Sequence, residues 1–111
     1  MTSQAKANYV NESEFNQLLT DEKLVVADYT ASWCGPCKVV APLMDQLATE
    51  YRDRATVVKI DIDENKDNAK KYGIRSIPAV LVFRDGEMVE SSFGSKPYET
   101  YSNILETQLK L

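Results

Sequence analysis

The chain has 111 residues, of which 43% are hydrophobic and 27% charged, and its formal net charge is −4. These values predict one globular domain over residues 1–111 and argue against a nucleic-acid-binding protein, which would carry a basic patch. No apolar run approaches the roughly 20 residues of a membrane span, and residues 1–10 lack the apolar core of a signal peptide, so we expect a cytoplasmic protein without a membrane anchor.

The first predicted elements lie before residue 21. Residues 1–6 are expected to form a frayed terminus, and residues 7–10 a short edge strand. Asn11 and Glu14 then form a variant of the capping box, which is typical of a helix start. Apolar residues follow at helical spacing, so a first helix is predicted over 12–20.

A central strand and a long helix are predicted next. Residues 24–29 are almost continuously apolar, as in a parallel strand covered on both faces. After a loop over 31–33, the second helix carries an apolar stripe predicted to comprise Val39, Val40, Leu43, Met44 and Leu47. Pro42 inside this helix removes a backbone hydrogen bond, so we expect a kink.

The second half of the chain continues the alternation of strands and helices. We predict a buried strand over 56–62, a short helix over 65–71 and a second buried strand over 79–83. A hairpin turn over 84–87 then leads to an antiparallel strand over 88–93, and a last helix starts at about residue 97. This order predicts an α/β fold with a mixed central sheet of about five strands flanked by about four helices.

Both cysteines lie in the Trp-Cys-Gly-Pro-Cys-Lys segment 33–38, where a strand runs into a helix. Cys34 is expected at the helix start, where free N–H groups and the helix dipole favour a thiolate, with Cys37 one turn later on the same face. Gly35 leaves the sulfurs accessible, and Pro36 suits a first helical turn. The spacing predicts a redox-active disulfide: Cys34, with the lower pKa, attacks a substrate disulfide, and the more buried Cys37 resolves the mixed disulfide.

Other uses of the two thiols fit less well. A static disulfide, or half of a metal site shared between chains, is the structural alternative, but a staple across so short a loop constrains little chain. The sequence contains no histidine, which excludes a Cys-His pair, a Ser-His-Asp triad and a His-bearing zinc site. We therefore expect no metal and no cofactor apart from the disulfide.

Asp28 lies in a strand otherwise made of hydrophobic residues. Either it sits at a strand end, where it reaches water or caps the next helix, or it is buried with a raised pKa and takes the proton of Cys37, directly or through a water. Lys59, on the next buried strand, either pairs with Asp28 or extends its ammonium group to solvent.

Several features spread along the chain match one known family. They are Asp28 six residues before Cys34, the segment 33–38, Pro42, Lys59, the segment 72–78 and Gly94. In this order they resemble the thioredoxins over nearly the whole chain. The resemblance implies a thioredoxin-like three-layer fold and a general protein-disulfide reductase, with Cys34 as nucleophile, Cys37 as resolving thiol and Asp28 as proton acceptor. One departure is Tyr29-Thr30, where thioredoxins usually carry Phe-Trp.

The resemblance also implies a substrate-docking surface and a set of partners. Pro78 read alone is an ordinary strand-starting proline, whereas the family implies a cis bond between Ile77 and Pro78 facing the cysteines. With Trp33 and Gly94, these residues would form a flat apolar surface for an extended substrate segment. The implied partners are disulfide-containing proteins and a thioredoxin reductase dependent on NADPH or ferredoxin. The implied protein is a monomer of the cytoplasm, or of an organelle if a leader is removed.

Two other functions are compatible with the same residues. A non-catalytic binding subunit of a larger complex would use the apolar surface without turnover. A thiol oxidase or isomerase generally carries histidine between its cysteines, so Gly35-Pro36 favours a reductant.

The acidic residues that follow the third strand are interpreted as a solvated face, and they are Asp61, Asp63, Glu64 and Asp67.

Overall fold

The computed structural model describes residues 5–111. In chain order its elements are β1 (Asn8–Tyr9), α1 (Glu12–Asp21), β2 (Leu24–Thr30), α2 (Cys37–Glu50), β3 (Thr56–Asp61), α3 (Lys66–Lys71), β4 (Ala79–Arg84), β5 (Glu87–Phe93) and α4 (Tyr98–Leu109). The frayed terminus expected over 1–6 falls largely outside the described residues; within them, the carbonyl of Ala5 accepts a hydrogen bond from the Thr49 hydroxyl at 2.8 Å.

The five described strands form one mixed sheet in the order β1-β3-β2-β4-β5. β3 is parallel to both β1 and β2, whereas β4 runs antiparallel to its neighbours β2 and β5. All seven residues of β2 are buried, as the apolar run predicts for a central strand. The predicted fold class is therefore confirmed.

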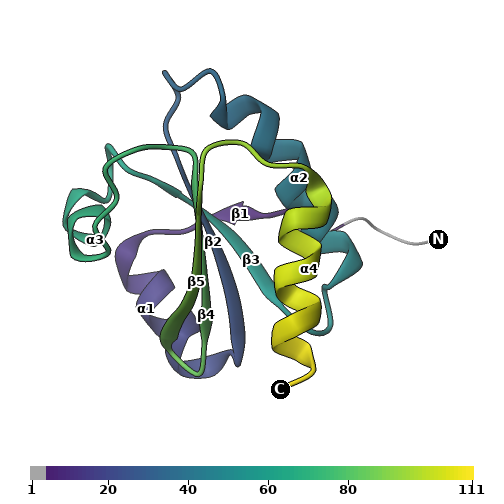
Figure 1. The fold of residues 1–111 in the computed structure, drawn as a ribbon. Helices are drawn as coiled ribbons and strands as arrows, with labels where there is room; N and C mark the ends of the chain where they lie inside the picture. The colour runs from purple at the N-terminus through teal and green to yellow at the C-terminus, as the bar shows by residue number, and fades with distance from the viewer. Residues whose placement is uncertain (1–4) are drawn as a thin grey trace.

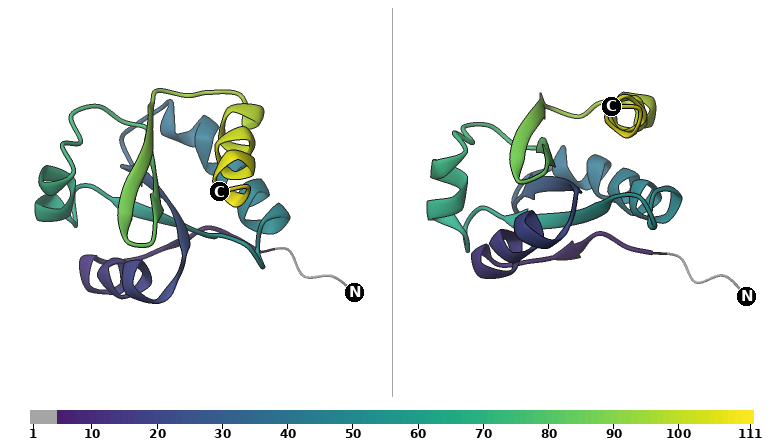
Figure 2. Two further views of the ribbon diagram at one scale, coloured as in Figure 1. Left: turned by 60° about the horizontal axis from the view of Figure 1, so that its bottom comes forward. Right: turned by 90° about the horizontal axis from the view of Figure 1, so that it is seen from below.

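Helices cover both faces of the sheet. α1 and α3 lie on one side, and α2 and α4 on the other (Figures 1 and 2). Successive side chains of a strand point to opposite faces, so Val26 of β2 packs with Met44 and Leu105 on one side, and Val25 packs with Phe15 on the other. The sheet thus separates two hydrophobic cores, which gives the three layers.

A local signal explains the start of α1, and a long-range contact holds α3. The side chain of Asn11 accepts a hydrogen bond from the Glu14 backbone N–H at 2.8 Å, and the Glu14 carboxylate accepts one from the Asn11 N–H at 2.9 Å. This is the capping box that the sequence predicts. α3 is attached to β2 by a buried bond in which the Tyr29 hydroxyl donates to Asn68 at 2.6 Å.

Two expectations for the second helix are wrong. The regular helix begins at Cys37 with Pro36 as its N-cap, three residues after the predicted start at Cys34. The residues before it form tighter turns, in which the Lys38 N–H donates to the Gly35 carbonyl at 3.0 Å. Val39 is 59% exposed and does not belong to the core stripe, because neighbouring helical residues diverge by about 100° and Val40 occupies the buried position.

None of the helices within residues 5–111 is long and apolar enough to cross a membrane. Pro42 lies inside α2 as predicted. The kink expected there stays a prediction.

Candidate functional site

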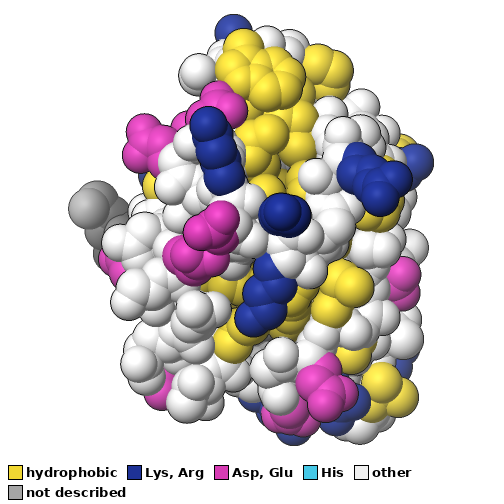
Figure 3. Space-filling view, turned by 90° about the vertical axis from the view of Figure 1, so that its left-hand side faces the viewer, with side chains coloured by type: hydrophobic (Ala, Val, Ile, Leu, Met, Phe, Trp, Pro, Cys, Tyr) yellow, Lys and Arg dark blue, Asp and Glu magenta, His cyan; other side chains and the backbone are white. Residues whose placement is uncertain are grey.

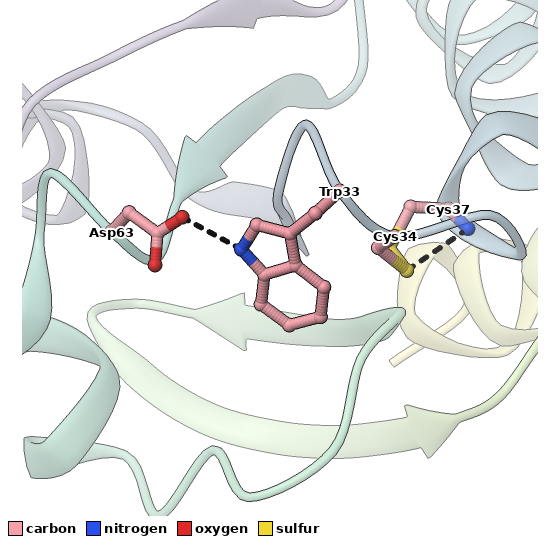
Figure 4. Close-up of a disulfide and its surroundings, with 4 residues drawn as sticks. All are labelled: Trp33, Cys34, Cys37 and Asp63. Atoms are coloured by element: carbon pink, nitrogen blue, oxygen red, sulfur yellow. Dashed lines mark hydrogen bonds between the residues drawn. A yellow bond between two sulfur atoms is a disulfide. The ribbon is translucent and has the colours of Figure 1, made fainter.

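The two cysteines are joined by a disulfide, with Cys34 in the loop that follows β2 and Cys37 as the first residue of α2 (Figure 4). Their Cα atoms are 5.4 Å apart. The backbone N–H of Cys37 donates to the sulfur of Cys34 at 3.2 Å. Although α2 starts later than predicted, its first N–H group therefore still points at the first sulfur, which favours a thiolate there.

Both cysteines are nearly buried. Cys34 is 4% exposed and Cys37 2%, so the expected difference in solvent access is small in the oxidised state. Around them lie Ala31 and the half-buried Ile62 and Ile77. The disulfide thus sits in an apolar rim, reached from one edge of the sheet.

The loop before β4 faces this rim through Ile77. The Ile77–Pro78 peptide bond is cis, as the resemblance implies. Gly94, directly after β5, donates its N–H to the Pro78 carbonyl at 2.8 Å, with a φ of +81° that L side chains rarely adopt. Pro78 itself is buried, so Ile77 before β4 and Gly94 after β5 are the accessible residues here.

Trp33 is the most prominent apolar side chain beside the disulfide. It is 66% exposed, and its indole N–H donates to the Asp63 carboxylate at 2.8 Å (Figure 4). Asp63 is itself fixed, since its backbone N–H donates to the Asp61 carboxylate at 2.8 Å. Hydrophobic side chains gather at the upper end of this face, with acidic and basic groups around them (Figure 3).

Asp63 is a functional candidate that the sequence interpretation missed. The run Asp61 to Asp67 is not only a solvated face, because Asp63 holds the indole. A signal was available: β3 and β2 are parallel neighbours, and the carboxyl ends of parallel strands meet at one edge of a sheet. A polar residue just past β3 is thus placed close to the loop that follows β2.

Asp28 is buried within the sheet, with 1% of its surface exposed. This excludes the alternative in which it reaches water from a strand end. Neither carboxylate oxygen has a hydrogen-bond partner among the described residues. Burial raises the pKa of Asp28 to about 7; Lys59 acts in the opposite direction, and Asp45 adds to the rise.

Lys59 fits neither of the two alternatives considered from the sequence, which were pairing with Asp28 alone and extending its ammonium group to solvent. It lies beside Asp28 in the parallel register of β2 and β3, and its ammonium group is 3.6 Å from the Asp45 carboxylate. Its side chain is only 12% exposed, so it does not simply extend into water.

The departure at Tyr29-Thr30 is accommodated inside the fold. Both residues are buried, and the hydroxyl of Tyr29 finds its partner in Asn68. Within residues 5–111, no three acidic or cysteine side chains are gathered so that they could hold a metal ion.

Comparison with known proteins adds a second kind of observation. A family model described as Thioredoxin matches residues 6–107. The chain is 49% identical over 90 residues to thioredoxin of Bacillus subtilis, covering 81% of this chain and 86% of that protein. It is 39% identical over 106 residues to the chloroplastic M-type thioredoxin of Chlamydomonas reinhardtii, covering 95% of this chain and 76% of that protein. A solved structure of a mutant thioredoxin from Halobacterium salinarum is similar with a TM-score of 0.85 and 33% identity, covering 96% of this chain and 94% of that chain.

Proposed function

The chain belongs to the thioredoxin family, and on this premise we propose that Cys34, Cys37 and Asp28 divide the steps of disulfide reduction among them. Members of the family are disulfide oxidoreductases whose redox group is a disulfide of the protein itself. The chain is accordingly a protein-disulfide reductase that needs no added cofactor. The resemblance drawn from the sequence is confirmed.

Cys34 is the attacking thiol in this proposal. In the reduced protein, its thiolate attacks one sulfur of a substrate disulfide, the substrate S–S bond breaks, and the released substrate thiolate takes a proton from water. The support is the Cys37 N–H group directed at the Cys34 sulfur, because a donor aimed at a sulfur stabilises its charged form. Gly35 and Pro36 form the turn that brings this N–H group to the sulfur.

Cys37 and Asp28 complete the exchange. The proton of the Cys37 thiol passes to the Asp28 carboxylate, directly or through a water. The Cys37 sulfur then attacks Cys34, closing the protein disulfide and expelling the second substrate thiolate. Two electrons pass from the protein to the substrate. An acid with a pKa of about 7 is suited to accept and return a proton near neutral pH.

Substrate docking is assigned to the apolar surface around the disulfide. Trp33 is exposed and Ile77 half-buried, and both offer apolar area, while Pro78 and Gly94 shape the loop beside them. An extended segment of a target protein could pair with the backbone of this loop as an added strand does.

Partners in general follow from the family: disulfide-containing target proteins and a reductase that reloads the disulfide. We further propose that this reductase depends on NADPH or ferredoxin, and that the protein is a monomer located in the cytoplasm, with an organelle as the alternative. A chloroplastic relative supports keeping that alternative.

The single observation that carries the proposal is the disulfide between the loop after β2 and the start of α2, in which the Cys34 sulfur faces the N–H group of Cys37. The test is reduction of insulin disulfides by dithiothreitol with and without the protein. Acceleration is expected for the natural chain, and a rate equal to that of the reagent alone would contradict the proposal. Cys37→Ser should trap a mixed disulfide at Cys34, whereas Cys34→Ser should trap none.

A binding subunit without turnover is the competing function. A variant with both cysteines replaced by serine separates the two, because binding of a partner would survive in it and reduction would not.

A further inference from the structure

A row of polar side chains crosses three neighbouring strands on the side of the sheet that α2 covers. Tyr9 of β1 is the register partner of Lys59 in β3, and Lys59 is the register partner of Asp28 in β2. Register partners of parallel strands share a face of the sheet. Lys59 thus lies between an exposed tyrosine and a buried carboxyl group.

The ammonium group of Lys59 has a second acid within reach. The Asp45 carboxylate of α2 is 3.6 Å from the nitrogen, and the ring of Tyr9 lies 5.8 Å from it. Asp28 competes for the same charge, since Lys59 lowers its pKa. One cation therefore serves two carboxyl groups, one of them half-exposed on a helix and the other buried in the sheet.

The carboxylate of Asp45 is held in place independently of Lys59. Its Oδ1 atom accepts a hydrogen bond from the Ala7 backbone N–H at 3.0 Å. The segment before β1 thus orients Asp45 toward Lys59, and the charge of this acid has a defined position rather than that of a free surface side chain.

Few other charged or titratable groups face Asp28. The residue paired with it on β4 is the apolar Val80. From α4, the hydroxyl of Tyr101 senses Asp28, since the Asp28 charge contributes to raising the pKa of Tyr101. β3 supplies Lys59, and α2 supplies Asp45.

We propose that Asp45 is a positioning residue for the proton transfer at Asp28, acting through Lys59. Its carboxylate holds the Lys59 ammonium on the outer side of the row and compensates its charge, so that Lys59 cannot fully stabilise the ionised form of Asp28. The inference rests on the proposed role of Asp28 as the proton acceptor of Cys37.

The physical reason is charge competition in a poorly solvated place. Lysine and aspartate attract each other strongly where little water screens them, and an opposite charge within about 4–6 Å favours the ionised form of an acid. Loss of the Asp45 charge leaves Lys59 with Asp28 as its acidic neighbour. Asp28 would then ionise more easily and hold a transferred proton less well.

The test is the titration of Asp28 in the oxidised protein, followed by the carbon-13 signal of its carboxyl group. Asp45→Asn removes the charge but keeps an oxygen for the Ala7 N–H. We expect the midpoint to fall from about 7 to about 6. Asp45→Glu, which restores the charge, should return the midpoint toward that of the natural chain.

A matched control is Glu50→Gln at the end of the same helix. It changes the net charge by the same amount, and Glu50 is not among the groups that act on Asp28. The titration midpoint of Asp28 in this variant should therefore equal that in the natural chain. Lys59→Met should raise the midpoint of Asp28. In a chain that already carries Lys59→Met, Asp45→Asn should shift this midpoint less than it does in the natural chain.

The outcomes separate this inference from the function on which it rests. An unchanged or raised midpoint in Asp45→Asn, or equal shifts with and without Lys59, would overturn the role of Asp45. If the midpoint falls as expected while the pH profile of mixed-disulfide resolution does not follow it, the role of Asp45 in setting Asp28 stands. The assignment of Asp28 as proton acceptor then fails.

Discussion

Asp28 is a buried acid in β2, and the other six residues of this strand are buried as well. No hydrogen-bond donor reaches it among the described residues, and Lys59, the cation that lowers its pKa, is shared with Asp45. A buried acid without a donor prefers its neutral form. The strand therefore keeps at its centre a group that is costly in its charged state.

This cost predicts how stability depends on pH. The pKa of Asp28 is raised from 3.8 to about 7 in the folded chain, so between these values the folded state holds a proton that the unfolded state has released. Folding stability should then fall as pH rises through this window, by at most about 4 kcal/mol. Asp28→Asn removes the penalty: the variant should unfold at higher urea than the natural chain at pH 8, and the gain should shrink toward pH 4.

Asp53→Asn, at an exposed position, is the control for a general charge effect. Parallel stability curves for Asp28→Asn and the natural chain from pH 4 to pH 8 would contradict the assigned burial cost.

The bond between Trp33 and Asp63 is the second feature at this scale. It fixes an exposed indole that would otherwise rotate freely beside the disulfide. Asp63→Ala should release the ring and lower kcat/KM for protein disulfides by about threefold to tenfold, the worth of one hydrogen bond. A small disulfide that needs no docking should react at the natural rate. Because Trp33 is the only tryptophan, acrylamide quenching of its fluorescence reports the release directly.

Glu64→Ala is the matched control, since Glu64 is the exposed neighbour of Asp63. Equal kinetics and equal quenching in the two variants would show that Asp63 does not hold the indole.

At the scale of elements, α1 and α2 start in different ways. α1 starts at a reciprocal pair of side-chain to backbone bonds, a purely local device that can be read from two residues. α2 has no side-chain cap, and it starts where the Gly35-Pro36 turn ends. Its free N–H groups are then available to a sulfur instead of a cap. Because no side chain caps α2, the N–H group of Cys37 is free to donate to the Cys34 sulfur.

The capping box of α1 can be measured by itself. Asn11→Ala removes the acceptor of the Glu14 N–H and should lower the free energy of unfolding by about 1 kcal/mol. Asn16→Ala, in the exposed middle of the same helix, should instead raise it by a few tenths of a kcal/mol, because alanine is the better helix former. Urea unfolding of both variants at pH 7 decides this, and equal losses would contradict the capping role.

At the scale of the whole molecule, stability comes from the sheet with a hydrophobic core on each face (Figure 2). The disulfide lies at one edge and closes a ring of only a few residues, since its cysteines are three apart in sequence. A cross-link over so short a loop restricts the unfolded chain little. The protein can therefore open and close its disulfide without losing its fold.

Reduction should accordingly cost at most about 2 kcal/mol of stability at pH 7. We expect the far-ultraviolet circular dichroism of the reduced and oxidised forms to coincide and both to unfold in one cooperative transition in urea. A reduced form without a cooperative transition would show that the disulfide is structural and not a redox carrier.

Much of the fold was predictable because its signals are local. The apolar run of β2, the capping box at Asn11 and the Asp85-Gly86 turn each depend on neighbours in the sequence, and the structure has a strand, a helix and a hairpin there. The same holds for the cysteine pair, whose spacing of three was sufficient to predict the disulfide. The wrong assignment of Val39 to the core arose because apolar character alone cannot choose between adjacent helical positions.

The sequence by itself determined the order of elements, the fold class and the dithiol, since all three follow from short-range periodicity and spacing. Only the tertiary structure decided that Asp63 holds the indole of Trp33, that Asp45 shares Lys59 with Asp28, and that Asn68 receives the hydroxyl of Tyr29. These pairs are far apart along the chain, and parallel strand pairing and helix packing bring them together. A charge or a hydrogen bond acts over a few ångströms of space, whatever the number of residues between its partners.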